Sequence, residues 1–198
     1  YQDGVVAYHS LTIQYDPYVI HTYYKPSTSC QDWVMAYLQE MIRHSVALLD
    51  LPSRHHEIPV FYDTESNSDL SALSRVMDRS PEELIRLHST PIYYIYMVGF
   101  LPGFPYLGTL PQELVVPRKS KPVQVQPGSV AIAGKQTGIY PLASPGGWHV
   151  LGQTPLRLFQ PEASIPVLLQ AGDTVSFIPI TRKEFDQQIQ LSDVHTNT

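Results

Sequence analysis

The chain has 198 residues, of which 43% are hydrophobic and 11% aromatic, so it is long enough to bury a substantial core. With 13 Lys and Arg against 18 Asp and Glu, its net charge of −5 provides no basic stripe for a nucleic-acid backbone. It has no apolar run of about 18 residues, which excludes a membrane-spanning helix. Its single cysteine, Cys30, excludes an internal disulfide and a thiolate cluster for a metal. We expect an intracellular, cytoplasmic protein without a metal site.

Residues 1–90 predict an α+β domain. Residues 32–49 carry apolar side chains every three or four positions, which is the spacing of a helix with one face toward a core. We also expect two paired strands before this helix, then a strand and two helices after it: 5–8, 11–15, 58–62, 70–77 and a helix from Pro81 onward.

The last of these helices has a defined start. Ser80 can cap it, Pro81 suits the first helical position, and Glu83 can complete a capping box. His88 lies near the helix C-terminus, where the helix dipole favours a cationic imidazole. His88 is therefore a candidate catalytic residue, although a lone histidine is more often structural.

Residues 91–198 hold ten of the 11 glycines and 13 of the 18 prolines. Many short apolar runs between such turn residues favour a compact β-barrel. We expect its strands at 92–98, 123–125, 129–132, 148–151, 156–159, 167–169 and 174–178. The predicted organisation is an α+β domain over 1–90, a barrel domain over 91–185 and a polar, fraying tail over 186–198.

Two segments resemble preorganised recognition loops. Residues 99–108 combine three glycines, two prolines and three aromatic residues, which neither a helix nor a central strand tolerates. Residues 144–148 read Ser-Pro-Gly-Gly-Trp. Stiff loops of this kind lower the entropy cost of binding, and their aromatic side chains are candidate anchors.

Residues 133–138 superficially resemble a phosphate-binding loop. The pattern fails because Ser129 stands where the first glycine belongs, Gln136 follows Lys135, and no long helix is expected next. A tight turn between strands, with Gly134 and Gly138 at positive φ, is the better interpretation.

Four polar or aromatic residues near these loops form a candidate site: Gln136, Tyr140, Ser144 and Trp148. They suit a small amide or carboxylate ligand, but Tyr140 and Trp148 can equally pack one end of the barrel. Arg118 can bind a carboxylate or phosphate as a planar fork, or form a surface salt bridge. Ser144 lacks the Gly-x-Ser-x-Gly elbow of serine hydrolases.

Long motifs resemble one family, which contains the B subunit of 5-oxoprolinase, the inhibitor of sporulation kinase A and allophanate hydrolase subunit 1, a carboxyltransferase-type domain. The resemblance runs from about Gly4 to Ile180. The matching segments are 57–60, 80–85 with His88, 98–111, 117–118, 128–134, 136–141, 144–148 and 171–175.

The resemblance implies an N-terminal α+β domain, incomplete here, followed by a cyclophilin-like β-barrel. It implies one component of an ATP-dependent 5-oxoprolinase, which converts 5-oxoproline, ATP and water to glutamate. The chain would be inactive alone and would act with a homologous partner, the C subunit or allophanate hydrolase subunit 2, binding ATP only in that complex. Two alternatives are a regulator that inhibits a sensor histidine kinase and a component of an allophanate hydrolase or urea amidolyase.

The resulting candidate site lies on one face of the barrel. Its expected catalytic residues are His88, Gln136, Tyr140 and Ser144. Its expected substrate- or partner-binding residues are Phe100, Pro102, Phe104, Tyr106, Arg118, Gly146, Gly147 and Trp148.

Three departures from the family pattern bear on this site. Val123, Gln126 and Gln153 replace residues usual in the family, and two of the replaced residues are arginines. Any carboxylate or phosphate contact of those arginines is therefore in question. A typical member is also expected to have roughly fifty residues before the position of Gly4.

Overall fold

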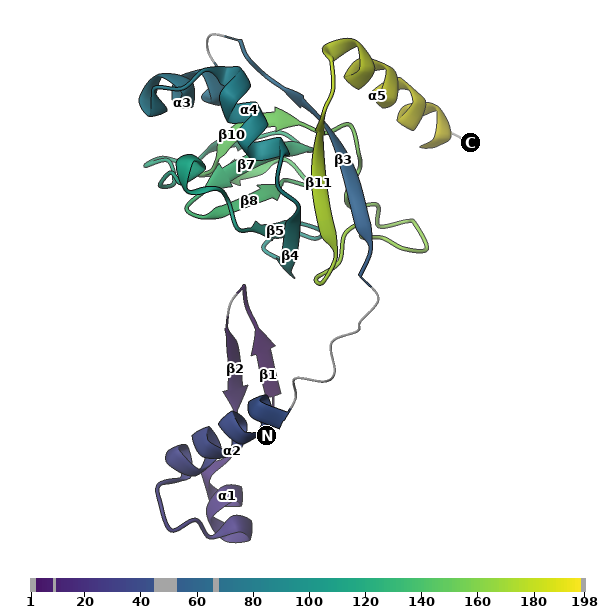
Figure 1. Ribbon diagram of the computed structural model, residues 1–198. Helices are drawn as coiled ribbons and strands as arrows, with labels where there is room; N and C mark the ends of the chain where they lie inside the picture. The colour runs from purple at the N-terminus through teal and green to yellow at the C-terminus, as the bar shows by residue number, and fades with distance from the viewer. Residues whose placement is uncertain (1–2, 9, 45–52, 66–67, 197–198) are drawn as a thin grey trace. The chain divides into compact units, whose positions relative to one another are not determined.

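The computed structural model describes residues 3–8, 10–44, 53–65 and 68–196, with side chains to residue 191 (Figure 1). The chain divides into two compact units, residues 1–52 and residues 53–198. This division differs from the expected boundary at residue 90, because the strand predicted at 58–62 pairs within the barrel of the second unit.

The first unit contains a hairpin and two helices. Strands β1 (Asp3–Val6) and β2 (Leu11–Gln14) pair antiparallel, as predicted. Helix α1 (Pro17–Tyr24) was not predicted, although Asp16 caps it by accepting from the N–H groups of Tyr18 and Val19. Helix α2 (Cys30–His44) confirms the predicted amphipathic helix, whose expected end at residue 49 lies outside the described residues.

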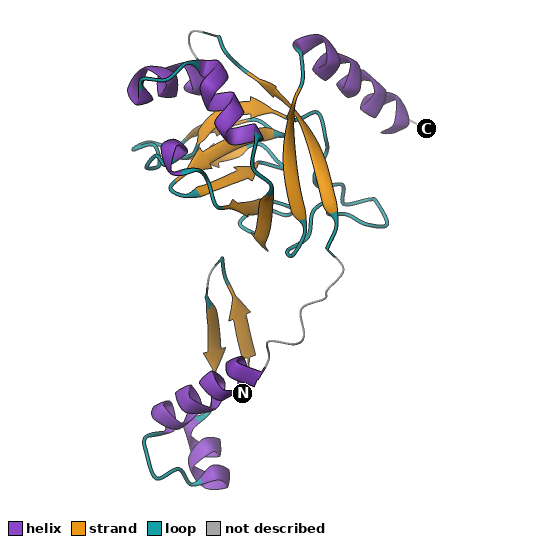
Figure 2. Ribbon diagram, in the orientation of Figure 1, coloured by secondary structure: helices purple, strands orange, loops and turns teal. Residues whose placement is uncertain are grey.

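The strands of the second unit, drawn in orange in Figure 2, close into a barrel. Their order around the barrel is β10-β3-β11-β4-β5-β8-β7. Strand β3 runs parallel to β11, while the other pairs of neighbours are antiparallel. The bounds are β3 (His55–Tyr62), β4 (Tyr93–Val98), β5 (Pro105–Gly108), β7 (Ser129–Ala133), β8 (Gln136–Ile139), β10 (His149–Gln153) and β11 (Thr174–Pro179). The α+β class with a β-barrel is therefore confirmed.

Shorter elements complete the second unit. Strands β6 (Val123–Val125) and β9 (Ser144–Gly146) form a separate two-stranded sheet. Helices α3 (Asp69–Met77) and α4 (Pro81–Ser89) bury Leu70, Leu73 and Leu84 in the barrel core. The remaining elements are the 3-10 helix η2 (Gln112–Leu114) and helix α5 (Arg182–Thr196).

The start of α4 confirms most of the predicted capping. Ser80 accepts from the Glu83 N–H at 3.1 Å, and Pro81 occupies the first turn. The Glu83 carboxylate, however, pairs with Arg79 rather than returning to Ser80, so the reciprocal half of the capping box is not made.

The same strands serve two cores because side chains alternate between the faces of a sheet. On β7, Val130 and Ile132 face the barrel interior, whereas Ala131 and Ala133 face outward into a second cluster. That second cluster also contains Phe104, Val125, Tyr140 and Trp148. The sheet is thus buried on both sides over β7 and β8.

Several local predictions are wrong. Residues 105–108, expected in a loop, form β5 in the barrel, which accommodates Pro105 at the first position of the strand. The segments 156–159 and 167–169 are not strands, and only one isolated bridge joins Phe159 to Val167. The expected tail is helical, and α5 begins before it, with Phe185 buried and its ring 5.9 Å from that of Phe61.

Candidate functional site

Four rings form what we call the outer aromatic cluster: Phe104, Tyr106, Tyr140 and Trp148. The Phe104 ring lies at its centre, 4.8 Å from Tyr106, 5.1 Å from Tyr140 and 5.5 Å from Trp148 between centroids. Phe104, Tyr140 and Trp148 are 1%, 2% and 5% exposed. Predicted site residues are thus brought together, but three of these rings are packed as core.

Glycines let this cluster approach the backbone. A Cβ at Gly138 would lie 2.8 Å from Phe104 Cζ, and one at Gly146 would lie 2.5 Å from Tyr140 Oη. Gly138 therefore serves close packing within β8 rather than a positive φ angle, which corrects that prediction. Gly134 does have a positive φ, 57°, in the tight turn between β7 and β8, as predicted.

The Tyr140 hydroxyl is the best-defined polar group of the cluster. Burial raises the pKa of Tyr140, while a hydrogen bond from the Trp148 backbone N–H and the positive charge of Arg118 oppose that rise. Burial likewise raises the pKa of Tyr106, again opposed by Arg118. Arg118, which is exposed, therefore lies close enough to act on both phenol groups.

Ser144 lies on β9, on the same face as Gly146. It is 8% exposed, and among the described residues its Oγ is the buried side-chain oxygen or nitrogen that has no hydrogen-bond partner. No base is therefore positioned to activate Ser144 as a nucleophile in this part of the chain.

The segment around Arg118 is held beside the 147–149 turn. Lys119 N–H donates to Gly147 O at 2.8 Å, and His149 Nε2 donates to Pro117 O at 3.0 Å. Lys119 also forms an ion pair with Asp69 of α3, whose Oδ2 accepts from the Val150 N–H. These bonds fix the backbone next to Arg118 and give His149 a structural bond.

His88 does not join this cluster. It lies inside the barrel, fully buried, with its ring stacked on Phe177 at 4.5 Å. Burial lowers the pKa of His88 to about 3, so the imidazole is neutral and the expectation of a cationic histidine is wrong. Desolvation outweighs the helix dipole that favoured the charge.

The bonds of His88 define its tautomer. Thr137 Oγ1 donates to Ala131 O, so it must accept from His88 Nε2, which lies 2.9 Å away. His88 Nδ1 then accepts from the Tyr62 hydroxyl at 2.8 Å. These hydrogen bonds satisfy the side chains of Tyr62, His88 and Thr137 while all three remain uncharged. The arrangement is therefore structural rather than catalytic.

The loop at 99–104 is ordered by its own backbone. Gly99 N–H donates to Phe104 O, and Phe104 N–H donates to Leu101 O, both at 3.0 Å. Phe104 is therefore core and not an exposed anchor, which corrects that expectation. Phe100, by contrast, is 67% exposed and has a φ of 72°, in the left-handed region. Pro102 is also exposed.

Gln136 is half-buried at the start of β8, on the outward face that it shares with Gly138. Gly147 is half-buried and in an open position, since a Cβ there would meet nothing closer than Lys119 O at 3.8 Å. Gln136 therefore lies on the same outward face as the outer aromatic cluster. Arg118 and Phe100 are exposed residues next to that cluster.

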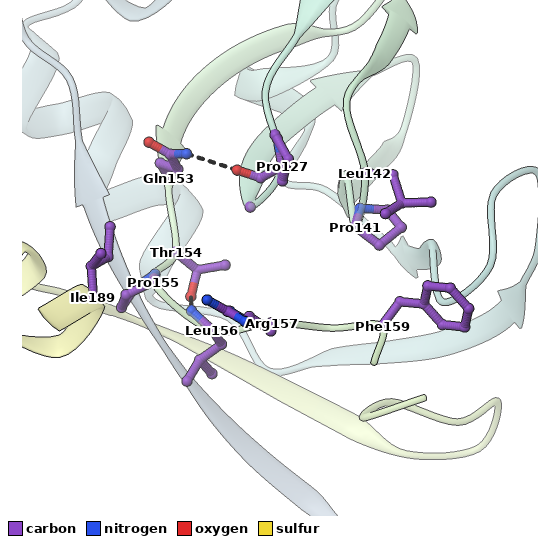
Figure 3. A pocket seen from close by; sticks show the side chains of 11 residues that line it. Pro127, Pro141, Leu142, Gln153, Thr154, Pro155, Leu156, Arg157, Phe159 and Ile189 are labelled. Atoms are coloured by element: carbon purple, nitrogen blue, oxygen red, sulfur yellow. Dashed lines mark hydrogen bonds between the residues drawn. The ribbon is translucent and has the colours of Figure 1, made fainter. Parts of the chain in front are cut away.

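A separate pocket was not found from the sequence. It has a volume of about 300 Å³ and lies at the end of β10, close to α5 (Figure 3). Its lining residues are Pro127, Gly128, Pro141, Leu142, Gln153, Thr154, Pro155, Leu156, Arg157, Phe159 and Ile189. One residue that departs from the family pattern, Gln153, lines this pocket, and it was the sequence signal that lay next to it.

Among the described residues, no group of three or more His, Cys, Asp or Glu side chains is arranged to hold a metal ion. No helix in the same ranges is both long and apolar enough to cross a membrane.

Comparison with known proteins identifies the family to which this closed barrel, with its second, outward core, belongs. The family described as carboxyltransferase domain, subdomain C and D, matches residues 1–169. The chain belongs to this family, and within it resembles proteins named as the B subunit of 5-oxoprolinase.

Two such relatives illustrate the similarity. The 5-oxoprolinase B subunit of Bacillus subtilis is 40% identical over 183 residues, covering 91% of this chain and 76% of that protein. The 5-oxoprolinase B subunit of Haemophilus influenzae is 50% identical over 140 residues, covering 70% of this chain and 66% of that protein.

A solved structure with a similar fold is that of the conserved uncharacterized protein PH0987 from Pyrococcus horikoshii. It is 40% identical, with a TM-score of 0.63, and the match covers 92% of this chain and 80% of that one.

Proposed function

We propose that the chain is one component of a multi-subunit, ATP-dependent 5-oxoprolinase. The observation that carries the proposal is the 40–50% identity to proteins named as the B subunit of that enzyme. Their name supports an enzyme with more than one kind of chain. We propose a homologous second subunit as the partner, a cytoplasmic location, and ATP that is bound only when the subunits are together.

The reaction needs ATP because a lactam is a poor electrophile. The lactam oxygen can attack the γ-phosphorus of ATP, releasing ADP and leaving the ring carbon activated. Addition of one water and cleavage of the ring C–N bond give an amine and an acyl phosphate. A second water releases phosphate and leaves glutamate, so atoms and charge balance.

The residues of this chain support a component that does not catalyse this sequence alone. Ser144 Oγ lacks a base among the described residues, and His88 is enclosed on the other face of the sheet. The turn between β7 and β8 holds Lys135 in a hairpin and not before a helix, so it lacks the context of a phosphate loop.

The test is 5-oxoproline-dependent ATP hydrolysis by the chain alone and together with a co-expressed candidate partner. We expect no turnover by the chain alone and coupled formation of glutamate and ADP by the complex. ATP hydrolysis by the pure chain, unaffected by any partner, would contradict the proposal. So would a stable complex that binds ATP but leaves 5-oxoproline intact.

A further inference from the structure

We propose that a surface site at Arg118 binds the carboxylate of a small ring acid, the chemistry of 5-oxoproline, between the Arg118 guanidinium and the Tyr140 hydroxyl. The inference rests on the proposed function, which supplies the lactam, and it places that ligand beside the outer aromatic cluster. Both groups are hydrogen-bond donors to which the described residues offer no acceptor.

The chain around Arg118 carries positive charge only. Residues 114–161 include five Lys or Arg side chains and no Asp or Glu. This stretch supplies β7, β8, β9 and β10 and two rings of the outer aromatic cluster. The carboxylate of Asp69 reaches it from α3, but that group is occupied by Lys119 and the Val150 N–H. An anionic ligand at Arg118 would therefore meet no opposing charge from the stretch itself.

Arg118 is the available cation of this region. Its side chain is exposed, and it forms no hydrogen bond or ion pair with the residues that the structure describes. The neighbouring Lys119, by contrast, is held by Asp69. A guanidinium binds a carboxylate through two parallel hydrogen bonds, which an ammonium group does not match. The free group is thus the one whose shape selects a carboxylate.

The Tyr140 hydroxyl has a proton to donate. It accepts a hydrogen bond from the Trp148 N–H, and no described residue accepts from it. The Tyr140 side chain is 2% exposed, so packing fixes the ring that carries this hydroxyl. Arg118 lies near enough for its charge to oppose the rise that burial causes in the pKa of Tyr140 and of Tyr106. A carboxylate paired with Arg118 on this side would accept the phenol proton as well.

The backbone at Arg118 is fixed before a ligand arrives. Pro117 O accepts from His149 Nε2 at 3.0 Å, and the Lys119 N–H donates to Gly147 O at 2.8 Å. These two bonds hold the residues on either side of Arg118 against the turn between β9 and β10. A fixed backbone lowers the entropy cost of ordering the guanidinium on a ligand.

The surroundings suit a small ring. Gly147 has no side chain, and a Cβ there would meet nothing closer than Lys119 O at 3.8 Å, so the turn leaves space. Tyr106 is half-buried and offers part of its ring for contact with methylene groups. The two oxygens of a carboxylate lie in one plane, and the guanidinium and the phenol together provide donors for both.

The test follows the arginine Nε–H NMR signals of the isotopically labelled chain during titration with three probes. These are 5-oxoproline, 2-pyrrolidinone, which lacks the carboxylate, and inorganic phosphate at matched ionic strength. Loss of a signal in Arg118→Lys identifies that of Arg118. We expect it to shift saturably with 5-oxoproline, with a Kd of about 1–10 mM, and to stay in place with 2-pyrrolidinone. Phosphate should bind at least about fivefold more weakly.

Matched variants assign the effect, with the backbone N–H signal of Gly147 as the common readout. Arg118→Gln should weaken 5-oxoproline binding about tenfold, because the charge-assisted pair is lost. Arg86→Gln removes an equal charge from an exposed position on α4 and should leave the affinity unchanged. Tyr140→Phe should weaken binding about threefold to tenfold. Tyr94→Phe, which removes a hydroxyl from an exposed ring on β4, should not.

The proposal is overturned if 5-oxoproline causes no saturable shift, or if Arg118→Gln binds it as the unaltered chain does. Phosphate that binds as tightly as 5-oxoproline also overturns it, since the site would then accept any anion. Failure of the site and failure of the proposed function are distinguishable. A complex that hydrolyses 5-oxoproline with the same KM when it carries Arg118→Gln refutes the site alone. Arg118-dependent binding without turnover in any complex refutes the function alone.

Discussion

Buried polar groups on the two faces of the β7–β8 hairpin differ in their hydrogen bonding. On the interior face, Tyr62, His88 and Thr137 satisfy one another in a single chain of hydrogen bonds. On the outward face, Tyr140 receives a bond from Trp148, but Ser144 Oγ has no partner among the described residues.

The bonded side chains of the interior face stabilise the fold, whereas the Ser144 hydroxyl makes no hydrogen bond to the described residues. Removing one member of a fully hydrogen-bonded buried network lowers the stability of the fold. An unpaired buried hydroxyl has lost its hydrogen bonds to water without gaining any in the protein, so it lowers stability itself. Burial of a histidine or a serine in a family motif is therefore not enough to indicate catalysis. The bonds it makes decide its role.

The largest expected effect separates core from anchor in the 99–104 loop. Phe104→Ala should lower the free energy of unfolding by about 3–5 kcal/mol, because it removes the central ring of the outer aromatic cluster. Phe100→Ala should cost less than about 1 kcal/mol, since that ring is exposed. Denaturant unfolding of both variants measures the difference, and equal losses would show that the two rings are not distinguished by burial.

The second effect is a pH dependence from the interior face. The folded pKa of His88 is about 3, below the ordinary value of 6.5, so the unfolded chain binds this proton first as the pH falls. Stability from this group is complete above pH 6.5 and is lost toward pH 3. Between about pH 6.5 and about pH 5 the loss should approach about 2 kcal/mol.

The measurement is denaturant unfolding at both pH values, beside a His88→Gln variant, which should lack this part of the slope. Imidazole NMR signals provide a direct readout, because His88 should remain the neutral Nε2–H tautomer at about pH 5. A protonated His88 in the folded chain at that pH would overturn the assignment.

The third effect tests close packing on the outward face with neighbouring glycines. Gly146→Ala places a Cβ 2.5 Å from Tyr140 Oη and 2.8 Å from Val125 Cγ2, so it should cost about 1–3 kcal/mol of stability. Gly147→Ala is the matched control, since its Cβ meets only Lys119 O at 3.8 Å. Thermal melting of the pair should rank them in that order, and a more harmful Gly147→Ala would contradict the packing described.

The smallest effect concerns the unpaired hydroxyl. Ser144→Ala removes a buried group without a partner among the described residues, so stability should stay the same or rise by up to about 1 kcal/mol. Thr137→Val, which strands His88 Nε2 and Ala131 O, should instead cost about 1–3 kcal/mol. A loss at Ser144 as large as that at Thr137 would mean that Ser144 has a partner in the folded chain.

Local patterns predicted much of the fold. The helical spacing of 32–49 and the capping residues at Ser80 and Pro81 located α2 and α4, because those signals depend on near neighbours. The domain boundary differed because β3 pairs with β11 across more than a hundred residues. Strand β5 was not predicted because proline and glycine have low local preference for strands. It forms because β4 and β8, on either side of it in the barrel, pair with it.

The sequence predicted which aromatic residues lie together, but not how deeply they are buried. The sequence grouped Phe104, Tyr140, Ser144 and Trp148, and the structure places them on or beside one outward face. Burial of those rings, and the enclosure of His88, depend on which face each strand presents, and a motif does not encode this. The pocket was missed because its residues come from turns and strand ends that are distant in sequence.

An NMR titration of the isotopically labelled chain with 5-oxoproline tests most directly whether the bonds of a buried family residue decide its role. We predict that the imidazole signals of His88, whose two ring nitrogens are bonded within the barrel, do not move on addition of 5-oxoproline. A shift of the His88 imidazole signals that saturates with 5-oxoproline would contradict the structural role assigned to this residue.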